Sequence, residues 1–112
     1  MAKLAVLGGG QMGEALVAGL LGSSWCRPDE VVVSGRREGR LGELAGSYGV
    51  DTSLDNAAAI KGASVIVLAV KPQDIDALLS SISAHVLPQH IVLSVVAAIP
   101  LALIEARLDE LV

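Results

Sequence analysis

The sequence has few of the residues that build aromatic cores or disulfide-bonded domains. Its 112 residues include no phenylalanine and only one tryptophan, one tyrosine and one cysteine. The lone Cys26 excludes an internal disulfide and argues against a thiolate metal cluster, so a reducing, cytoplasmic location is the simplest expectation. The core must be aliphatic, which suits parallel strands that are covered on both faces.

Charge is also scarce. Charged residues make up 18% of the chain and the formal net charge is −4. Because a general nucleic-acid-binding domain is normally basic, we expect no nucleic-acid partner, and any polyanion site must be local. The 53% hydrophobic content favours a buried core over disorder. The length fits one domain over residues 1–112.

Long uninterrupted hydrophobic runs are missing as well. The most apolar stretch, residues 4–22, is interrupted by Gln11 and Glu14 and diluted by glycines, and a poor signal-cleavage site follows it. We therefore expect neither export nor a membrane-spanning segment.

What the sequence does contain is a regular alternation of apolar runs and helical segments. The patterns predict strands over residues 3–7, 30–34, 50–52, 64–70 and 89–96. They predict helices over residues 12–21, 38–47, 54–61, 73–85 and 100–108. Because no hairpin signal separates the strands, right-handed βαβ crossovers are expected. The prediction is an α/β, doubly wound parallel sheet of the Rossmann type, with strand order 3-2-1-4-5 and helices on both faces.

The strand over residues 3–7 leads directly into Gly8-Gly9-Gly10-Gln11-Met12-Gly13, and a helix follows. In such a motif Gly8 permits the tight turn, Gly10 lets the backbone approach a pyrophosphate, and Gly13 lets the helix pack close to the strand. The motif alone is weak in a chain with 12 glycines. The strand before it and the helix after it favour nucleotide binding over a turn that has lost its ligand.

The end of the second predicted strand indicates which nucleotide is bound. An NAD site usually has an acid there, whereas this strand ends Ser34-Gly35-Arg36-Arg37. Ser34 can donate a hydroxyl, Arg36 can fork onto phosphate oxygens, and Arg37 can stack on adenine or add charge. The alternative is that both arginines are solvated surface residues. At this position the pattern favours the 2′-phosphate of NADP.

Two more residues are candidates from their positions. Lys71, at the carboxyl end of the fourth predicted strand, either contacts ribose or substrate or simply faces solvent. Asn56 near a helix start can be a capping residue, as can Asp55 or Ser53. Of the remaining polar residues, His85 and His90 lack metal-ligand spacing, Asp74 and Asp76 suit a helix dipole, and no nucleophilic or acid–base arrangement is evident.

Taken together, these motifs resemble those of the pyrroline-5-carboxylate reductase family over essentially the whole chain. The resemblance rests on Gly8–Gly13, Ser34-Gly35-Arg36-Arg37, Asn56, Ala69-Val70-Lys71-Pro72-Gln73 and Ser94-Val95-Val96-Ala97-Ala98-Ile99. It implies NADPH-dependent reduction of the imine of 1-pyrroline-5-carboxylate to proline. It also implies cofactor-binding roles for Gly8, Gly10, Gln11, Met12, Gly13, Ser34, Arg36, Arg37, Asn56, Ala69, Lys71 and Ala97.

Two departures from the family pattern matter. The family commonly has glycine where this chain has Ala98, and an added methyl can crowd a ligand. Family members also continue with an Arg-x-Met-Pro-Asn-x-Pro stretch and a helical domain for dimerisation and substrate, and these 112 residues contain neither. We therefore expect a cofactor-binding domain that does not turn over alone, with apolar surface exposed near residues 99–112, from a protein that is homo-oligomeric at full length. The alternatives are a coenzyme F420-dependent NADP reductase domain and a non-catalytic NADP-sensing module, and Asn56 with the Val-Lys-Pro-Gln run favours the proline enzyme.

Overall fold

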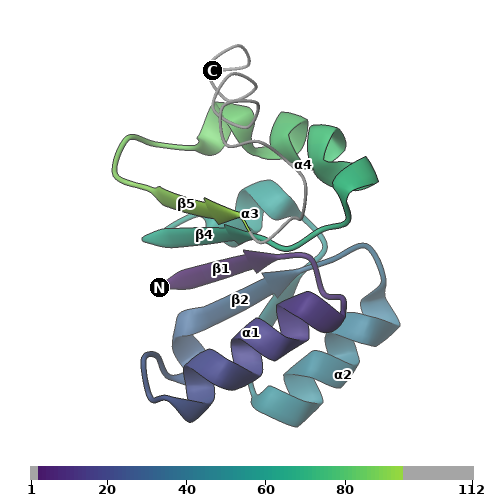
Figure 1. Cartoon of the computed structure of the whole chain (residues 1–112), viewed down its shortest axis with the longest axis vertical. Helices are drawn as coiled ribbons and strands as arrows, with labels where there is room; N and C mark the ends of the chain where they lie inside the picture. Colours follow the sequence, from purple (N-terminus) through teal and green to yellow (C-terminus); the bar gives the residue numbers. More distant parts are fainter. Residues whose placement is uncertain (1–2, 95–112) are drawn as a thin grey trace.

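The computed structural model describes residues 3–94, and within them a single parallel sheet lies between two layers of helices (Figure 1). Its strands run in the order β3-β2-β1-β4-β5. The strand bounds are β1 Leu4–Leu7, β2 Val31–Ser34, β3 Asp51–Ser53, β4 Val65–Leu68 and β5 Ile91–Ser94. This confirms the predicted Rossmann-type sheet and its strand order.

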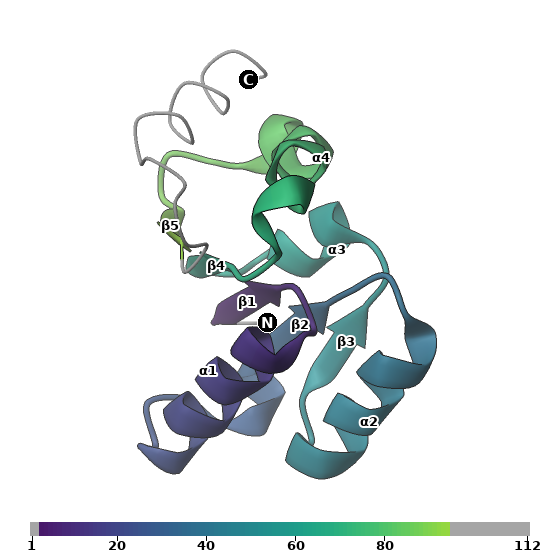
Figure 2. The ribbon, with the colours of Figure 1, turned by 45° about the vertical axis from the view of Figure 1, so that its right-hand side comes forward.

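The helices cover both faces of the sheet, as predicted. Helices α1 (Gln11–Gly22) and α2 (Glu38–Tyr48) lie on one face, and α3 (Asn56–Ile60) and α4 (Ile75–Ile82) on the other (Figure 2). Because side chains alternate along a strand, β1 contributes to two cores. Leu4 and Val6 pack on the α1 and α2 side, whereas Ala5 and Leu7 pack on the α3 and α4 side.

The core is aliphatic on both faces, as the missing aromatics require. All four residues of β1 are buried, and the strand pairs in parallel with β2 on one side and β4 on the other. Cys26 is buried in the core on the α1 side, and burial raises the pKa of its thiol. The single cysteine therefore serves here as a small apolar side chain.

Two predicted helices differ from the observed ones. The segment predicted as one helix over residues 73–85 consists of α4 between two 3₁₀ turns, Pro72–Asp74 and Ser83–His85. Pro72 begins the first turn, which Asp74 closes by donating its N–H to the carbonyl oxygen of Lys71 at 2.9 Å. Helix α3 starts at Asn56, later than predicted. The predicted cap at Asp55 is confirmed, since its carboxylate accepts from the N–H of Ala57.

Other predictions fall where the structure gives no description. The helix over residues 100–108, the last two residues of the fifth predicted strand, Ala97, Ala98 and the apolar surface near residues 99–112 lie outside the described residues. Between residues 3 and 94, none of the helices has the length and apolar character needed to cross a bilayer.

Candidate cofactor-binding site

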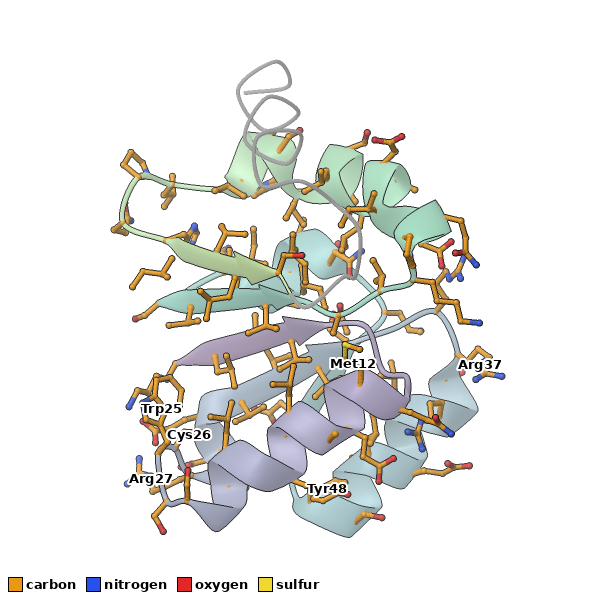
Figure 3. All side chains as sticks on the ribbon, viewed as in Figure 1. Met12, Trp25, Cys26, Arg27, Arg37 and Tyr48 are labelled. Atoms are coloured by element: carbon orange, nitrogen blue, oxygen red, sulfur yellow. The ribbon has the colours of Figure 1, made fainter. Side chains whose placement is uncertain are left out.

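A cavity of about 600 Å³ lies at the edge of the sheet where β1, β2 and β4 end. Loops after these strands meet there because parallel strands share one carboxyl edge. Figure 3 places Met12 and Arg37 toward this end of the sheet, and Trp25 and Cys26 at the opposite end. The cavity is lined by Gly8, Gly9, Gly10, Ser34, Gly35, Arg36, Arg37, Arg40, Leu41, Leu54, Asn56, Ala69, Val70, Lys71, Asp74, Ala77 and Leu78.

Most of the predicted site residues therefore come together, but not all of them. Gly8, Gly10, Ser34, Arg36, Arg37, Asn56, Ala69 and Lys71 line the cavity. Gln11, Met12 and Gly13 form the adjoining first turn of α1 and do not line it.

The glycine loop has the geometry expected of its three spaced glycines. Gly8 adopts a φ of +125°, and a Cβ at Gly8 would lie 2.6 Å from the carbonyl oxygen of Ala69. A Cβ at Gly13 would overlap the carbonyl oxygen of Gly8, so close packing of α1 on the loop requires glycine there. A Cβ at Gly10 would meet no protein atom within 4 Å. The backbone at Gly10 is therefore open to a ligand.

The loop also presents a helix start to the cavity. Gly8 donates its N–H to the carbonyl oxygen of Ser34 at 3.0 Å, which joins the loop to the end of β2. The first hydrogen bond of α1 runs from the N–H of Glu14 to the carbonyl oxygen of Gly10. The amides of the first turn have no partners within the helix, and they carry the positive end of its dipole. Such a terminus suits an anionic group.

Ser34 is completely buried at the end of β2, and its hydroxyl is hydrogen-bonded inside the protein. Ser34 Oγ donates to Asn56 Oδ1 at 2.5 Å, and Asn56 Nδ2 donates to Ser81 Oγ at 3.2 Å. The amide of Asn56 is thus oriented from both ends at the cavity wall. Asn56 does not cap the helix, because Asp55 does so. Ser34 and Asn56 were both predicted to bind the cofactor, but no signal in the sequence predicted the hydrogen bond between them.

Arg36 and Arg37 follow β2 and border the cavity with their positive charges. The Arg36 side chain is 85% exposed, and its Nη2 lies 3.3 Å from Asp74 Oδ2. Asp74 belongs to the 3₁₀ turn after β4, so this ion pair connects two loops. Asp74 was predicted only to suit a helix dipole, and it also lies beside Arg36 at the cavity.

Arg40 is a cavity residue that sequence analysis missed. It lies on α2, and its Nε donates to the carbonyl oxygen of Gly9 at 2.7 Å. Its Nη2 donates to Glu14 Oε1 at 2.5 Å, and Tyr48 OH donates to Glu14 Oε2 at 2.7 Å. These contacts join residues 26 to 34 positions apart, and no local pattern in one sequence predicts them.

Glu14, Arg40 and Tyr48 form a hydrogen-bonded group, called here the Glu14 cluster. These hydrogen bonds shift the pKa of each of the three side chains. The hydrogen bond from Tyr48, followed by the one from Arg40, lowers the pKa of Glu14. The bond to Glu14 raises the pKa of the Tyr48 phenol and of the Arg40 guanidinium. Glu14 is therefore a carboxylate, and Arg40 and Tyr48 are both protonated donors, at neutral pH.

The chemistry of the cavity is that of anion binding. Backbone amides and arginines border it, and Asp74 is the one carboxylate among the described residues that line it. Between residues 3 and 94, no group of His, Cys, Asp and Glu side chains is arranged to hold a metal ion. His90 Nδ1 instead accepts a hydrogen bond from the N–H of Leu87. The residues present can bind and orient a phosphorylated ligand.

The chain is similar to known NADP-dependent reductases. A family model described as NADP oxidoreductase, coenzyme F420-dependent, matches residues 3–98. A pyrroline-5-carboxylate reductase from Corynebacterium melassecola is 40% identical over 94% of this chain. The solved structure of a pyrroline-5-carboxylate reductase from Coxiella burnetii has 28% identity and a TM-score of 0.90 over 97% of this chain and 40% of its own chain.

A further solved structure shares the fold. A pyrroline carboxylate reductase from Plasmodium falciparum, solved with NADP bound, has a TM-score of 0.81 at 21% identity over 96% of this chain and 38% of its own. The present chain spans about 40% of the length of the curated relatives that it matches.

Proposed function

We propose that this chain, which belongs to the coenzyme F420-dependent NADP oxidoreductase family, is the NADPH-binding domain of a reductase that acts on 1-pyrroline-5-carboxylate. The observation that carries the proposal is the composition of the cavity. An open glycine loop at a helix start lies beside two arginines, where an NAD-specific site usually has an acid. The pyrroline-5-carboxylate reductases among its relatives support the choice of reaction.

The residues present fit such a cofactor. The amides of the Gly8–Gly13 loop, with Gln11 and Met12 at the start of α1, would hold the pyrophosphate. Arg36 and Ser34 would bind the 2′-phosphate, and Asn56 would lie on the adenosine side. To donate to the phosphate, the Ser34 hydroxyl would turn away from Asn56.

The two ends of the cofactor would meet different walls of the cavity. Arg37 is proposed for the adenine face. Ala69, Lys71 and Ala97 are proposed for the nicotinamide half. When bound, NADPH supplies the hydride for the imine carbon, while the imine nitrogen takes up a proton to give proline.

The chain contributes the cofactor domain of this reaction. Since it spans about 40% of the relatives' length, we propose that residues 1–112 form the dinucleotide-binding domain. Other parts of the whole protein would complete the substrate pocket and supply the proton donor. Homo-oligomeric assembly of the whole protein and a cytoplasmic location belong to the same proposal.

One alternative has a specific observation in its favour. The description of the matching family names coenzyme F420, so hydride transfer between reduced F420 and NADP⁺ is a second candidate activity. The pyrroline enzyme is favoured because the curated relatives that match at 32–40% identity are pyrroline-5-carboxylate reductases. An NADP-sensing module without chemistry is the third candidate.

Cofactor titration tests the binding part of the proposal. The purified chain is titrated with NADPH and with NADH, and NADPH is expected to bind at least about 10-fold more tightly, from one additional charge-assisted phosphate contact. Equal affinities would contradict an NADP site.

The reaction is tested on the full-length protein. Consumption of NADPH is measured with 1-pyrroline-5-carboxylate, and formation of NADPH is measured with reduced F420 and NADP⁺. Turnover in the first assay supports the proposal. Turnover in the second assay alone would favour the F420 enzyme, and tight binding without either reaction would favour the sensor.

A further inference from the structure

We propose that Arg40 is a positioning residue for the pyrophosphate half of the cofactor site, and that Glu14 and Tyr48 hold its guanidinium in place. The inference rests on the proposed NADPH binding, and it adds residues that neither the glycine motif nor the 2′-phosphate loop includes. It starts from one contact, the 2.7 Å hydrogen bond from Arg40 Nε to the carbonyl oxygen of Gly9.

This contact controls the direction of an amide in the glycine loop. A trans peptide unit is planar, so the carbonyl of Gly9 and the N–H of Gly10 point in opposite directions. Arg40 binds that carbonyl oxygen from α2 and thereby sets the direction of the Gly10 N–H. Of the glycines in this loop, Gly10 is the one whose Cβ position has no protein atom within 4 Å.

The loop needs an external support of this kind. Gly8, Gly9 and Gly10 are consecutive, and glycine has the largest backbone freedom of any residue. Gly10 caps α1 without a side chain that can form a capping hydrogen bond. A guanidinium holds its donors in a rigid planar fork, so it can contact the loop and a carboxylate together.

The surroundings of Arg40 keep it in this position. Its side chain is 23% exposed, compared with 85% for Arg36. Nη2 binds one oxygen of Glu14, and the phenol of Tyr48 binds the other oxygen. Because Glu14 offsets the charge of Arg40, Arg40 contributes geometry to the loop more than net positive potential.

The two arginines would act on different parts of the cofactor. Arg36 would act on the 2′-phosphate through its charge, whereas Arg40 would act on the pyrophosphate through the backbone. A ligand that has the 2′-phosphate but no pyrophosphate should therefore depend on Arg36 and not on Arg40. Adenosine 2′-monophosphate is such a ligand.

The experiment measures dissociation constants of NADPH and adenosine 2′-monophosphate for the wild-type chain, Arg40→Gln and Arg40→Lys. Both variants are expected to weaken NADPH binding by about 10-fold, because the Gly10 N–H is no longer held in place and its charge-assisted hydrogen bond to the pyrophosphate is lost. Binding of adenosine 2′-monophosphate should stay within about twofold of wild type, because its phosphate does not reach the loop. Lysine keeps the charge but lacks the planar fork, so it should not restore NADPH binding.

A pair of glutamate variants provides the matched control. Glu14 and Glu43 both form ion pairs with Arg40, but Glu43 is 69% exposed and binds Nη1 at 3.3 Å. Glu14→Gln should weaken NADPH binding in the same direction as Arg40→Gln, and Glu43→Gln should leave it unchanged. If Arg40→Gln does not fold, Glu14→Gln and Arg40→Lys carry the test with the same two ligands.

Two results would overturn the inference while the proposed function survives. The first is wild-type NADPH affinity in both Arg40 variants. The second is an equal loss for NADPH and adenosine 2′-monophosphate, which would give Arg40 a general structural or charge role. If the wild-type chain binds no NADPH, the proposed function itself fails.

Discussion

Arg36 and Asp74 lie side by side at the cavity, with Nη2 of the guanidinium 3.3 Å from Oδ2 of the carboxylate. Arg36 follows β2 and Asp74 follows β4, so the pair joins the two loops on either side of the glycine loop. The carboxylate occupies one of the guanidinium's two terminal nitrogens and offsets its charge. A 2′-phosphate bound as proposed would share Arg36 with Asp74.

Removal of the Arg36 side chain should discriminate between cofactors. Arg36→Ala is expected to weaken NADPH binding by about 10- to 100-fold, because a charge-assisted phosphate contact is lost. NADH lacks the 2′-phosphate, so its affinity should change little. Both dissociation constants are measured by titration of the variant, and equal losses for the two cofactors would contradict a role at the 2′-phosphate.

Removal of the competing charge should have the opposite effect. Asp74→Asn is expected to strengthen NADPH binding by about 2- to 5-fold at low salt, since the carboxylate no longer offsets the charge of Arg36. The gain should shrink as salt is added. Asp76→Asn changes the same charge on α4 outside the cavity lining and serves as the control. A loss of affinity in Asp74→Asn would show that the carboxylate helps binding.

The geometry of Gly8 predicts a large cost for any side chain there. Gly8→Ala should lower the free energy of unfolding by about 2–4 kcal/mol, because a residue at φ +125° is strained and its Cβ would overlap the carbonyl of Ala69. Gly42→Ala is the matched control inside α2, where a Cβ meets no atom within 4 Å. It should raise stability by about 0.5–1 kcal/mol. Denaturant unfolding of the two variants gives both values, and an unaffected Gly8→Ala chain would contradict the described loop.

The Glu14 cluster predicts how the protein responds to pH. The raised pKa of Tyr48 means that its bond to Glu14 stabilises the fold fully below the ordinary tyrosine value of about 10, and that this contribution is lost as pH rises through the folded pKa. The lowered pKa of Glu14 means that its contribution is present above about 4.3 and lost as pH falls through the folded pKa.

Because Tyr48 is the one tyrosine of the chain, its titration is directly visible in the ultraviolet absorbance of tyrosinate. The midpoint should lie above that of the unfolded chain. Glu14→Gln should move it back toward the ordinary value, because the negative acceptor is gone. A midpoint that is the same in the wild type and Glu14→Gln would show that the two groups do not interact in solution.

Much of the fold could be predicted because its signals are local. Each of three short patterns predicts its own element: the β-branched run of β2, the apolar run of β4 and the glycine turn after β1. The absence of hairpin signals predicted a parallel sheet, and a parallel sheet places the residues after β1, β2 and β4 on one edge. The helix bounds were less accurate around Pro72 and Asp55, where a 3₁₀ turn and a capping side chain changed the start of a helix.

The layered sheet, its strand order and the loops at its carboxyl edge follow from the sequence, because strand and helix periods and turn residues act over short distances. The side-chain contacts within those loops do not. Ser34 with Asn56, Arg36 with Asp74 and Arg40 with Glu14 join residues 22 to 38 positions apart. Such contacts follow from how two packed elements direct their side chains, and no periodic pattern of a single sequence records that direction.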